Sequence, residues 1–247
     1  MTADRIIDNR DRDRMPAVSI IIPTYQHADS LARCLPSIFD QTYRDFEVIV
    51  VNDGSTDHTP QVLGPFADRI MIIHQANHGR NPARNRGFRE ARGRYLLFCD
   101  ADIVMRPDFL EKMVAALETN PGASYAYASF KFGWKTFRLW PFDAAKLRKM
   151  NYIHTTSLIR REHFPGFDES IKRLQDWDLW LTMLGQGQVG VWIPEVLSRA
   201  IPHRGGLSTW VPGIFYRIPW RLFGIRIRTV EQFLEAERIV KAKHGLD

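Results

Sequence analysis

Cysteine is scarce in this chain. Only Cys34 and Cys99 occur among 247 residues, far apart and without CxxC spacing, so neither a disulfide framework nor a zinc site is expected. No run of about 18 consecutive apolar residues is present, and we expect no membrane-spanning helix. The first fifteen residues alternate aspartate with arginine and lack the apolar core of a signal peptide. We therefore expect a flexible lead over 1–15 and a cytoplasmic protein.

Charged and apolar residues, by contrast, are plentiful. The chain has 34 Lys and Arg against 28 Asp and Glu, a formal net charge of +6, and 45% hydrophobic residues. Such a composition suits a globular protein with a sizeable core and excludes disordered and collagen-like classes. The positive balance indicates an anionic partner, and nucleic acid, a phosphorylated small molecule and an anionic membrane surface all remain open.

The first half alternates apolar runs with amphipathic stretches. The runs are short, rich in Val, Ile or Leu on both faces, and end at turn residues, which is typical of buried parallel strands. They lie at 17–22, 46–51, 70–74 and 94–99, and the amphipathic stretches at 29–40, 56–66, 82–91 and 107–118. The pattern predicts an α/β fold, with a mostly parallel sheet covered by helices on both faces.

The second half is less regular. We predict a strand over 123–130, an aromatic and basic segment over 131–150, and an extended segment over 152–161. A strong helix begins at Asp176, a strand over 189–193 ends at Pro194, and a closing helix covers 229–244.

Polar residues follow each of the four predicted parallel strands. Ligands of such sheets bind beyond the carboxyl ends of the strands, so we expect these residues to form one site. They are Thr24-Tyr25, Asn52-Asp53, Asn77-His78 and Asp100-Ala101-Asp102.

Two acidic motifs each have a structural alternative. Asp100 and Asp102 offer the oxygen ligands that suit Mg²⁺ or Mn²⁺, but they also fit a solvated turn in which Asp102 caps the next helix. Asp53 fits a contact to a base or sugar, although Asn-Asp-Gly is common turn chemistry.

Basic and acidic groups further along the chain have two interpretations each. Arg80, Arg84 and Arg86 can hold a diphosphate or form an exposed helix face. Asp176 and Asp178 begin the strongest helix, where an aspartate can act as general base or simply favour the helix N-terminus. His203, beside Gly205-Gly206, is a metal ligand or a structural histidine.

The ordered set of motifs resembles the inverting glycosyltransferases of family 2, which have the GT-A (Rossmann-like) fold. The motifs are VSIIIPTYQHADSLARCLPSIFDQTYRDFEVIVVNDGSTD, ANHGRNPARNRGF, YLLFCDADI and GFDESIKRLQDWDLWLTM, and the resemblance covers residues 17–205. It implies a GT-A domain over 16–205 and a basic, aromatic C-terminal extension over 206–247.

The resemblance also implies roles for individual residues in binding a nucleotide-sugar, a divalent cation (Mn²⁺ or Mg²⁺) and an acceptor. In the donor site it assigns nucleotide contacts to Thr24 and Tyr25, the uracil contact to Asp53, a place in the nucleotide pocket to Arg84 and a place near the ribose to Asp100. Metal contacts fall to Asp102 and His203, and the general base is Asp176. Gln175 replaces a frequent glutamate, which leaves Asp178 as a rival base.

The implied reaction is a single displacement from a UDP-sugar to a hydroxyl of a saccharide or lipid-linked acceptor, in polysaccharide or glycolipid synthesis. The segment 196–230 has no acidic residue and many Arg and aromatic residues, so 206–228 is expected to touch either the acceptor cleft or the inner face of the cell membrane. Two other classes are a sugar-phosphate nucleotidyltransferase, which would need a glycine-rich loop after the first strand, and a noncatalytic nucleic-acid binder. Nucleic acid is the partner that the acidic motifs favour least.

Overall fold

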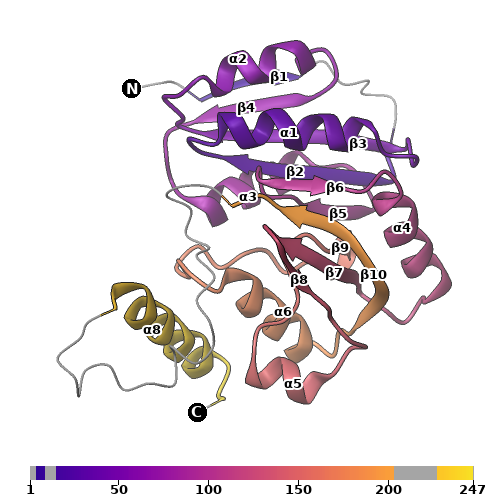
Figure 1. Ribbon diagram of the computed structural model, residues 1–247, viewed down its shortest axis with the longest axis vertical. Coiled ribbons are helices and arrows are strands. Elements are labelled where there is room, and N and C mark those ends of the chain that lie inside the picture. The colour runs from indigo at the N-terminus through magenta and orange to yellow at the C-terminus, as the bar shows by residue number, and fades with distance from the viewer. Residues whose placement is uncertain (1–3, 9–14, 203–226, 247) are drawn as a thin grey trace.

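The computed structural model describes residues 4–8, 15–202 and 227–246 (Figure 1). Its strands are β1 (Arg5–Asp8), β2 (Val18–Thr24), β3 (Phe46–Asp53), β4 (Met71–Gln75), β5 (Tyr95–Phe98), β6 (Ile103–Met105), β7 (Tyr125–Phe132), β8 (Lys135–Phe137), β9 (Leu158–Arg160) and β10 (Gly190–Ala200). Its α-helices are α1 (Ala28–Phe39), α2 (Thr59–Leu63), α3 (Arg80–Glu90), α4 (Phe109–Thr119), α5 (Ala144–Lys149), α6 (Gln175–Gly185) and α8 (Arg228–Lys243), with 3-10 turns η1 (Gly64–Phe66) and η2 (Arg161–His163).

The described strands form one mixed sheet in the order β1-β4-β3-β2-β5-β9-β7-β10-β6, with β8 added to β7. β4, β3, β2 and β5 are parallel neighbours, as the four apolar runs predict. The second half inserts β9, which is antiparallel to both β5 and β7, while β10 runs parallel to β7. The prediction of a mostly parallel sheet flanked by helices is confirmed.

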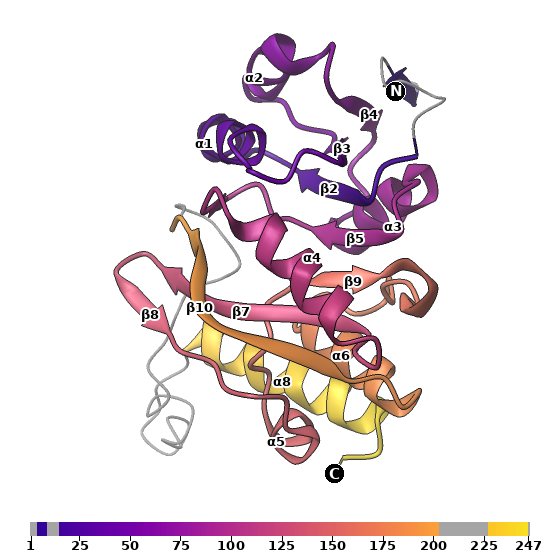
Figure 2. The same cartoon turned by 90° about the vertical axis from the view of Figure 1, so that its right-hand side faces the viewer.

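Alternate residues of the central strands face two different cores, which is why these strands are apolar throughout. Ile20 and Ile22 lie in one core with the helices α1 and α4, whereas Ile21 lies in the other with α3 and α6. Figure 2 shows α1 and α3 on opposite sides of β2. A strand buried on both faces needs this continuous apolar pattern.

The N-terminal segment departs from the expected flexible lead. Residues 5–8 form β1, which pairs antiparallel with β4 in the register Ile6↔Ile73 and covers the edge of the sheet. Two isoleucines within four residues supply the strand propensity, and β4 offers an unpaired edge. The alternating charges of 9–14 lie outside the described residues.

The last strand also differs from its prediction. It does not end at Pro194 but continues to Ala200, with register shifts against β7 between Ile193 and Val196 and between Val196 and Ser198. Proline, which lacks an N–H, is tolerated at such an irregularity.

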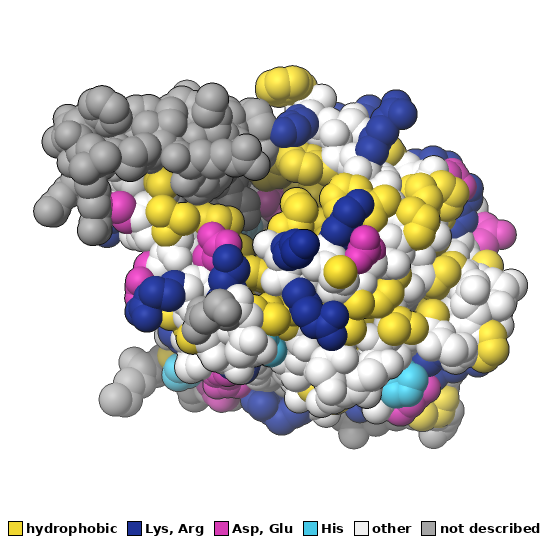
Figure 3. Space-filling model, turned by 90° about the horizontal axis from the view of Figure 1, so that it is seen from below, with side chains coloured by type: hydrophobic (Ala, Val, Ile, Leu, Met, Phe, Trp, Pro, Cys, Tyr) yellow, Lys and Arg dark blue, Asp and Glu magenta, His cyan; other side chains and the backbone are white. Residues whose placement is uncertain are grey.

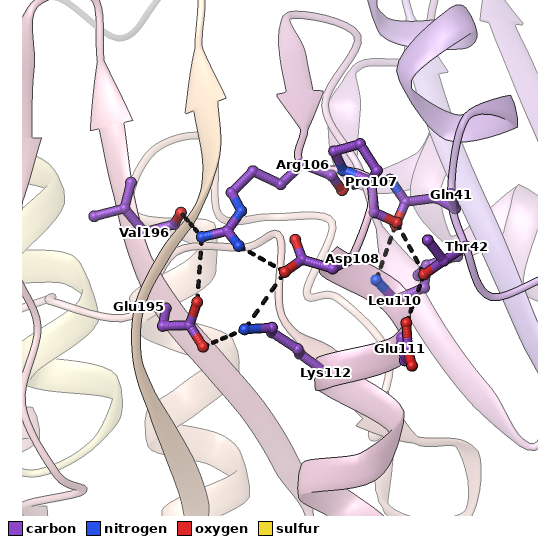
Figure 4. A network of polar contacts seen from close by, with 10 residues as sticks. All are labelled: Gln41, Thr42, Arg106, Pro107, Asp108, Leu110, Glu111, Lys112, Glu195 and Val196. Atoms are coloured by element: carbon purple, nitrogen blue, oxygen red, sulfur yellow. Dashed lines mark hydrogen bonds and ion pairs between the residues drawn. The ribbon is translucent and has the colours of Figure 1, made fainter.

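A charged network holds this irregular part of β10 against the start of α4 (Figure 4). The carboxylate of Glu195 pairs with Lys112 and, at 3.2 Å, with Arg106. Arg106 also pairs with Asp108 at 2.6 Å. The side chain of Gln41, fully buried, donates to the Arg106 carbonyl at 2.7 Å and accepts from Leu110 N–H at 2.9 Å.

Several local expectations were wrong in detail. The segment 152–161 contributes only β9, and β6 was not predicted. The stretches expected at 82–91 and 107–118 form helices that begin at Arg80 and at Phe109, and α1 continues through Pro36. Local signals locate helices better than their exact ends. Cys99 is buried, and burial raises the pKa of its thiol well above the ordinary value.

Within the described part of the chain, no helix is both long and apolar enough to cross a membrane. The closing helix predicted at 229–244 is confirmed as α8. Of the C-terminal extension expected over 206–247, residues 206–226 lie outside the described residues.

Candidate functional site

The carboxyl ends of β2, β3 and β5 meet at one edge of the sheet, because these strands are parallel neighbours. Thr24 and Asp53 are the last residues of β2 and β3, and Asp100 follows β5 by two residues. The structure therefore brings together three of the four strand-end motifs that the sequence singles out, and the fourth, Asn77-His78 after β4, joins them because His78 N–H donates to Asp53.

Arg84 and Asp100 form the central pair of this edge. The guanidinium Nη2 donates to Asp100 Oδ1 at 2.6 Å, and the Arg84 side chain is 1% exposed. Its guanidinium also lies 4.9 Å from the ring centre of Phe167. Burial lowers the pKa of Arg84, whereas Arg84 holds the pKa of Asp100 far below its usual range against the opposing effect of burial. Both groups are thus charged, and the alternative of an exposed helix face is wrong for Arg84.

The helix α3 places Arg84 by anchoring the loop after η2. Asn81 Nδ2 donates to the carbonyls of Asp168 and Ile171, at 2.7 and 3.2 Å. The side chain of Asn85 both donates to and accepts from the backbone of Phe167, at 2.8 and 2.9 Å. The two asparagines of the ARN-containing motif thus fix the loop that carries Phe167. Further along the helix, Arg86 pairs with Glu90 at 2.7 Å and not with an acidic residue of the DAD motif.

Asp53 organises the loop after β4. Its Oδ1 accepts from Gln75 Nε2 at 2.7 Å and from His78 N–H at 3.0 Å, and its Oδ2 accepts from Gly79 N–H at 2.9 Å. The carboxylate is 3% exposed. The turn after β3 is likewise held in place, since Asn52 Oδ1 accepts from Ser55 N–H at 3.0 Å. The turn interpretation and a binding role are compatible, because Asp53 fixes the backbone of the loop after β4 at the strand-end edge of the sheet.

The segment after β2 offers a candidate ligand contact. Thr24 is 2% exposed, and its hydroxyl has no hydrogen-bond partner among the described residues. Tyr25, the next residue, is 46% exposed. Gln26 follows with a φ of 56°, and its Oε1 accepts from the N–H groups of Thr56 and Asp57. A strained residue therefore joins the turns after β2 and β3 beside an unused buried hydroxyl.

Asp102 fits a cation site. Burial and the neighbouring Asp100 raise its pKa to about 6. None of the described residues forms an ion pair with its carboxylate. It does not cap a helix, because β6 follows it directly and α4 begins only at Phe109. A buried carboxylate with a raised pKa beside a second carboxylate is stabilised by a bound divalent cation. No cluster of three metal-ligating side chains occurs among the residues described, and His203 lies outside them.

The two aspartates of α6 have different surroundings. Asp178 is 3% exposed, and its carboxylate pairs with Lys243 Nζ and His244 Nε2 of the C-terminal segment, both at 2.8 Å. Asp176 is half-buried in the first turn of α6, where its Oδ1 accepts from Trp177 N–H at 3.0 Å. Leu174, just before α6, has a φ of 57°, so strained backbone directs the start of this helix. These pairs join α6 to α8 through Asp178.

His154 is the site residue that sequence reasoning missed. Burial lowers its pKa, and the carboxylates of Asp100 and Asp176 oppose that shift, so both charges lie near the imidazole. Its Nδ1 accepts from Thr156 N–H at 3.1 Å, which leaves Nε2 as the proton-bearing nitrogen of the neutral ring. The ring also packs 4.8 Å from that of Phe130. His154 thus feels the charges of both Asp100 and Asp176, in a segment without a recognisable motif.

The sequence comparisons agree with this geometry. The model of glycosyl transferase family 2 matches residues 19–173. The chain belongs to this family. It is 37% identical over 119 residues to the uncharacterized glycosyltransferase YibD of Escherichia coli K12, a match that covers 47% of this chain and 35% of that protein. It is 31% identical over 203 residues to a hyaluronan synthase of Pasteurella multocida, which covers 74% of this chain and 20% of that protein.

Solved structures share the GT-A fold with this family 2 chain. Residues 1–349 of S. aureus TarS, crystallised with UDP-GlcNAc, match with a TM-score of 0.66 and 20% identity, over 81% of this chain and 63% of that one. A mannosyltransferase of Pyrobaculum calidifontis, in complex with GDP-Man and Mn²⁺, matches with a TM-score of 0.62 and 21% identity, over 78% and 59% of the two chains. The chain thus spans about a third of the length of YibD and a fifth of the length of the hyaluronan synthase.

Proposed function

We propose that this family 2 chain is an inverting glycosyltransferase that moves a sugar from a UDP-sugar to a hydroxyl acceptor. The observation that carries the proposal is the juxtaposition of the buried Arg84–Asp100 pair with the acidic Asp102 at the edge where β2, β3 and β5 end. A sheet edge with a buried cation, an unused hydroxyl and a carboxylate of raised pKa suits a nucleotide diphosphate with a metal ion.

The donor side of the site follows from the strand ends. Thr24 supplies its unpartnered hydroxyl and Tyr25 an exposed ring. Asp53 supplies a carboxylate, held in place by hydrogen bonds, beneath the nucleotide base. Arg84 keeps Asp100 ionised and oriented, which suits Asp100 for a ribose hydroxyl. The preference for UDP is supported by the TarS complexes with UDP and UDP-GlcNAc, while the GDP-Man complex of the mannosyltransferase makes GDP the rival nucleotide.

Asp102 is the described residue that would hold Mn²⁺ or Mg²⁺, with His203 as the further ligand. When bound, the cation supplies positive charge beside the departing diphosphate. Asp102 meets the chemical requirement, since burial and Asp100 make its negative charge costly in spite of the nearby Arg80 and Arg84.

The base of the reaction is Asp176. It is half-buried. Its carboxylate and that of Asp100 both favour the protonated form of the His154 imidazole, so both charges lie near this ring. In the proposed displacement, Asp176 takes the proton of the acceptor hydroxyl as that oxygen attacks the anomeric carbon and the bond to the diphosphate breaks. The pairs of Asp178 with Lys243 and His244 support Asp176, and not Asp178, in this role.

The acceptor is a saccharide or a lipid-linked sugar, in cell-surface polysaccharide or glycolipid synthesis, and the reaction takes place in the cytoplasm or on the inner face of the cell membrane. The relative named hyaluronan synthase supports a saccharide acceptor. We expect no nucleic-acid substrate, and the matched family is neither of the two rival classes.

The deciding experiment is a donor screen by nucleotide release. Purified protein is incubated with UDP- and GDP-sugars, with Mn²⁺, with Mg²⁺ and with EDTA, and saccharide acceptors are added in turn. We expect release from one UDP-sugar, dependent on the metal and increased by an acceptor. Release from no nucleotide-sugar, together with no binding of UDP in the presence of Mn²⁺, would refute the proposal. An anomeric configuration retained in the product would refute the inverting mechanism alone.

A further inference from the structure

Residues 131–150 form a basic surface, here called the hairpin–α5 surface. It combines the β7–β8 hairpin tip with α5 and the loop between them. Its basic residues are Lys131, Lys135, Arg138, Lys146, Arg148 and Lys149, against the single acid Asp143. Asp143 is the N-cap of α5, where its side chain accepts from Lys146 N–H at 2.9 Å. Six positive charges against one give +5 within twenty residues, compared with +6 for the whole chain.

A tryptophan projects from the tip of this hairpin. Trp134 is 87% exposed and follows Gly133 in the two-residue loop that connects Phe132 to its partner Lys135. Gly133 has a φ of 56°, as the first central position of a type II′ turn requires. Gly133 N–H donates to the Ala200 carbonyl at 3.0 Å, so the tip is held against β10. A large apolar side chain is therefore presented on rigid backbone.

The rest of the surface repeats this combination of charge and apolar area. Arg138, Arg148 and Lys149 are exposed, and Met150 at the end of α5 is 49% exposed. Lys146 lies over the ring of Trp140, at 4.6 Å from its centre. Viewed from below, the molecule shows Lys and Arg side chains gathered among apolar ones on the face that contains α5 (Figure 3).

The sheet topology places the hairpin tip at the edge that carries the candidate site. β7 is antiparallel to β9, and β9 is antiparallel to β5, so β7 and β5 run in the same direction. The carboxyl end of β7, which leads into the Trp134 loop, therefore lies at the same edge as Asp100 after β5. β10 is parallel to β7 and also ends there.

We propose that the hairpin–α5 surface docks this protein on an anionic phospholipid bilayer, with Trp134 inserted at the level of the lipid headgroups. Tryptophan favours the membrane–water interface, and nearby Lys and Arg are attracted by anionic lipid headgroups. A hairpin tip is convex, so it suits insertion into a soft phase better than it suits wrapping around a chain of sugars or nucleotides. The docked orientation turns the strand-end edge toward the bilayer surface.

The inference is independent of the chemistry proposed for the site, and it names described residues other than those of the 206–228 segment. The test is flotation of the full chain with two kinds of vesicle, phosphatidylcholine alone and phosphatidylcholine with phosphatidylglycerol. Two variants probe the surface: Trp134→Ser removes the apolar tip, and the triple variant Arg138→Glu, Arg148→Glu, Lys149→Glu reverses its exposed charge.

We expect the wild type to bind the anionic vesicles, more weakly in high salt and more weakly still to the neutral ones. Each variant should lower the affinity about tenfold or more. The charge-matched control is Arg33→Glu, Arg89→Glu, Lys172→Glu, three exposed residues outside the surface, which should bind much more tightly than the surface triple variant. Nucleotide release without an acceptor and circular dichroism check that every variant is folded.

A second readout addresses the tip itself. Lipids brominated near the headgroup should quench part of the tryptophan fluorescence of the wild type. Trp134→Phe should keep the vesicle affinity within about threefold and lose that part of the quenching.

Three results would overturn the proposal. In the first, the wild type does not bind anionic vesicles. In the second, both surface variants bind these vesicles as tightly as the wild type. In the third, the wild type binds heparin or RNA, and the triple variant loses that binding while its vesicle binding is unchanged. The last result would identify the surface as a polyanion site, and the second would leave membrane contact to the 206–228 segment. Nucleotide release by wild type in solution separates all three from failure of the proposed activity.

Discussion

The guanidinium of Arg84, 1% exposed, donates to the carboxylate of Asp100 at 2.6 Å. The pair joins α3 to the end of β5, and the packing of Phe167 against Arg84 adds the loop after η2. The positive charge of Arg84 thus lies beside Asp100, at the end of β5, in the absence of any ligand. We expect the donor side of the proposed site to depend on this ion pair.

Replacement of Arg84 by methionine should cost both stability and donor binding. The change leaves Asp100 without its partner, and removal of one member of a buried ion pair costs about 3–5 kcal/mol, less here because Asp100 is 24% exposed. Urea unfolding should show the loss, and titration with UDP and Mn²⁺ should show weakened binding. As a control, Arg86→Met on the same helix should change the free energy of unfolding by less than about 1 kcal/mol, because Arg86 pairs with Glu90 near the surface.

Asp176→Asn and Asp178→Asn form a matched pair of variants on one helix. Asp176→Asn should bind UDP normally and lose transfer by about 100-fold or more, because the acceptor proton has no base. Asp178→Asn should keep kcat within about threefold but lower the free energy of unfolding by about 1.5–3 kcal/mol, because it weakens the pairs with Lys243 and His244. Turnover and urea unfolding of both variants check the pair. The reverse assignment of the two effects would make Asp178 the base.

Cation affinity should depend on pH through Asp102. Its pKa in the metal-free protein is raised to about 6 by burial and by Asp100, and only the carboxylate form binds a cation. Protonation therefore competes with the metal below pH 6, and the affinity for Mn²⁺ should fall up to about tenfold per pH unit there while staying nearly constant above pH 7. Calorimetric titration between pH 5 and pH 7.5 measures this dependence. An unchanged profile in Asp102→Asn would assign the titration to another group.

His154→Ala should reduce transfer more than donor binding. The neutral imidazole keeps its proton on Nε2 and lies near the carboxylates of Asp100 and Asp176, so we expect it to position the sugar or the acceptor between them. The expected change is about a tenfold loss in kcat/KM with the Kd for UDP within about threefold. The control His244→Gln should leave kcat/KM unchanged, since His244 contacts Asp178. An equal loss of UDP affinity in His154→Ala would instead place His154 in the nucleotide pocket.

The part of the candidate site that lies at the strand ends could be predicted from the sequence. Thr24, Asp53 and Asp100 follow apolar runs whose parallel pairing brings them to one edge, so local pattern was enough. The partner of Arg84 required the packing of α3 against β2 and β3, and His154 lies in a segment with no periodic pattern. Contacts between residues far apart in the chain leave no local signal.

The two aspartates of α6 show the same limit. Both stand in the first turn of one helix, and apart from the family resemblance, which assigns the base to Asp176, no local pattern separates them. The docking of α8 gives them different surroundings, because Lys243 and His244 reach Asp178 from 65 and 66 residues away. Likewise, residues 5–8 became a strand because β4 presented an edge to pair with, and not because of their own charge pattern.

By itself, the sequence determined the alternation of strands and helices, the apolar character of both sheet faces and the edge at which the acidic motifs meet. These are consequences of short-range periodicity, which fixes which side chains share a face. Only the tertiary structure decided which aspartate is available, which carboxylate Arg84 neutralises and how the basic hairpin stands beside the site. Those outcomes depend on the packing of segments separated by tens of residues, where burial and ion pairing, and not local propensity, select the contacts.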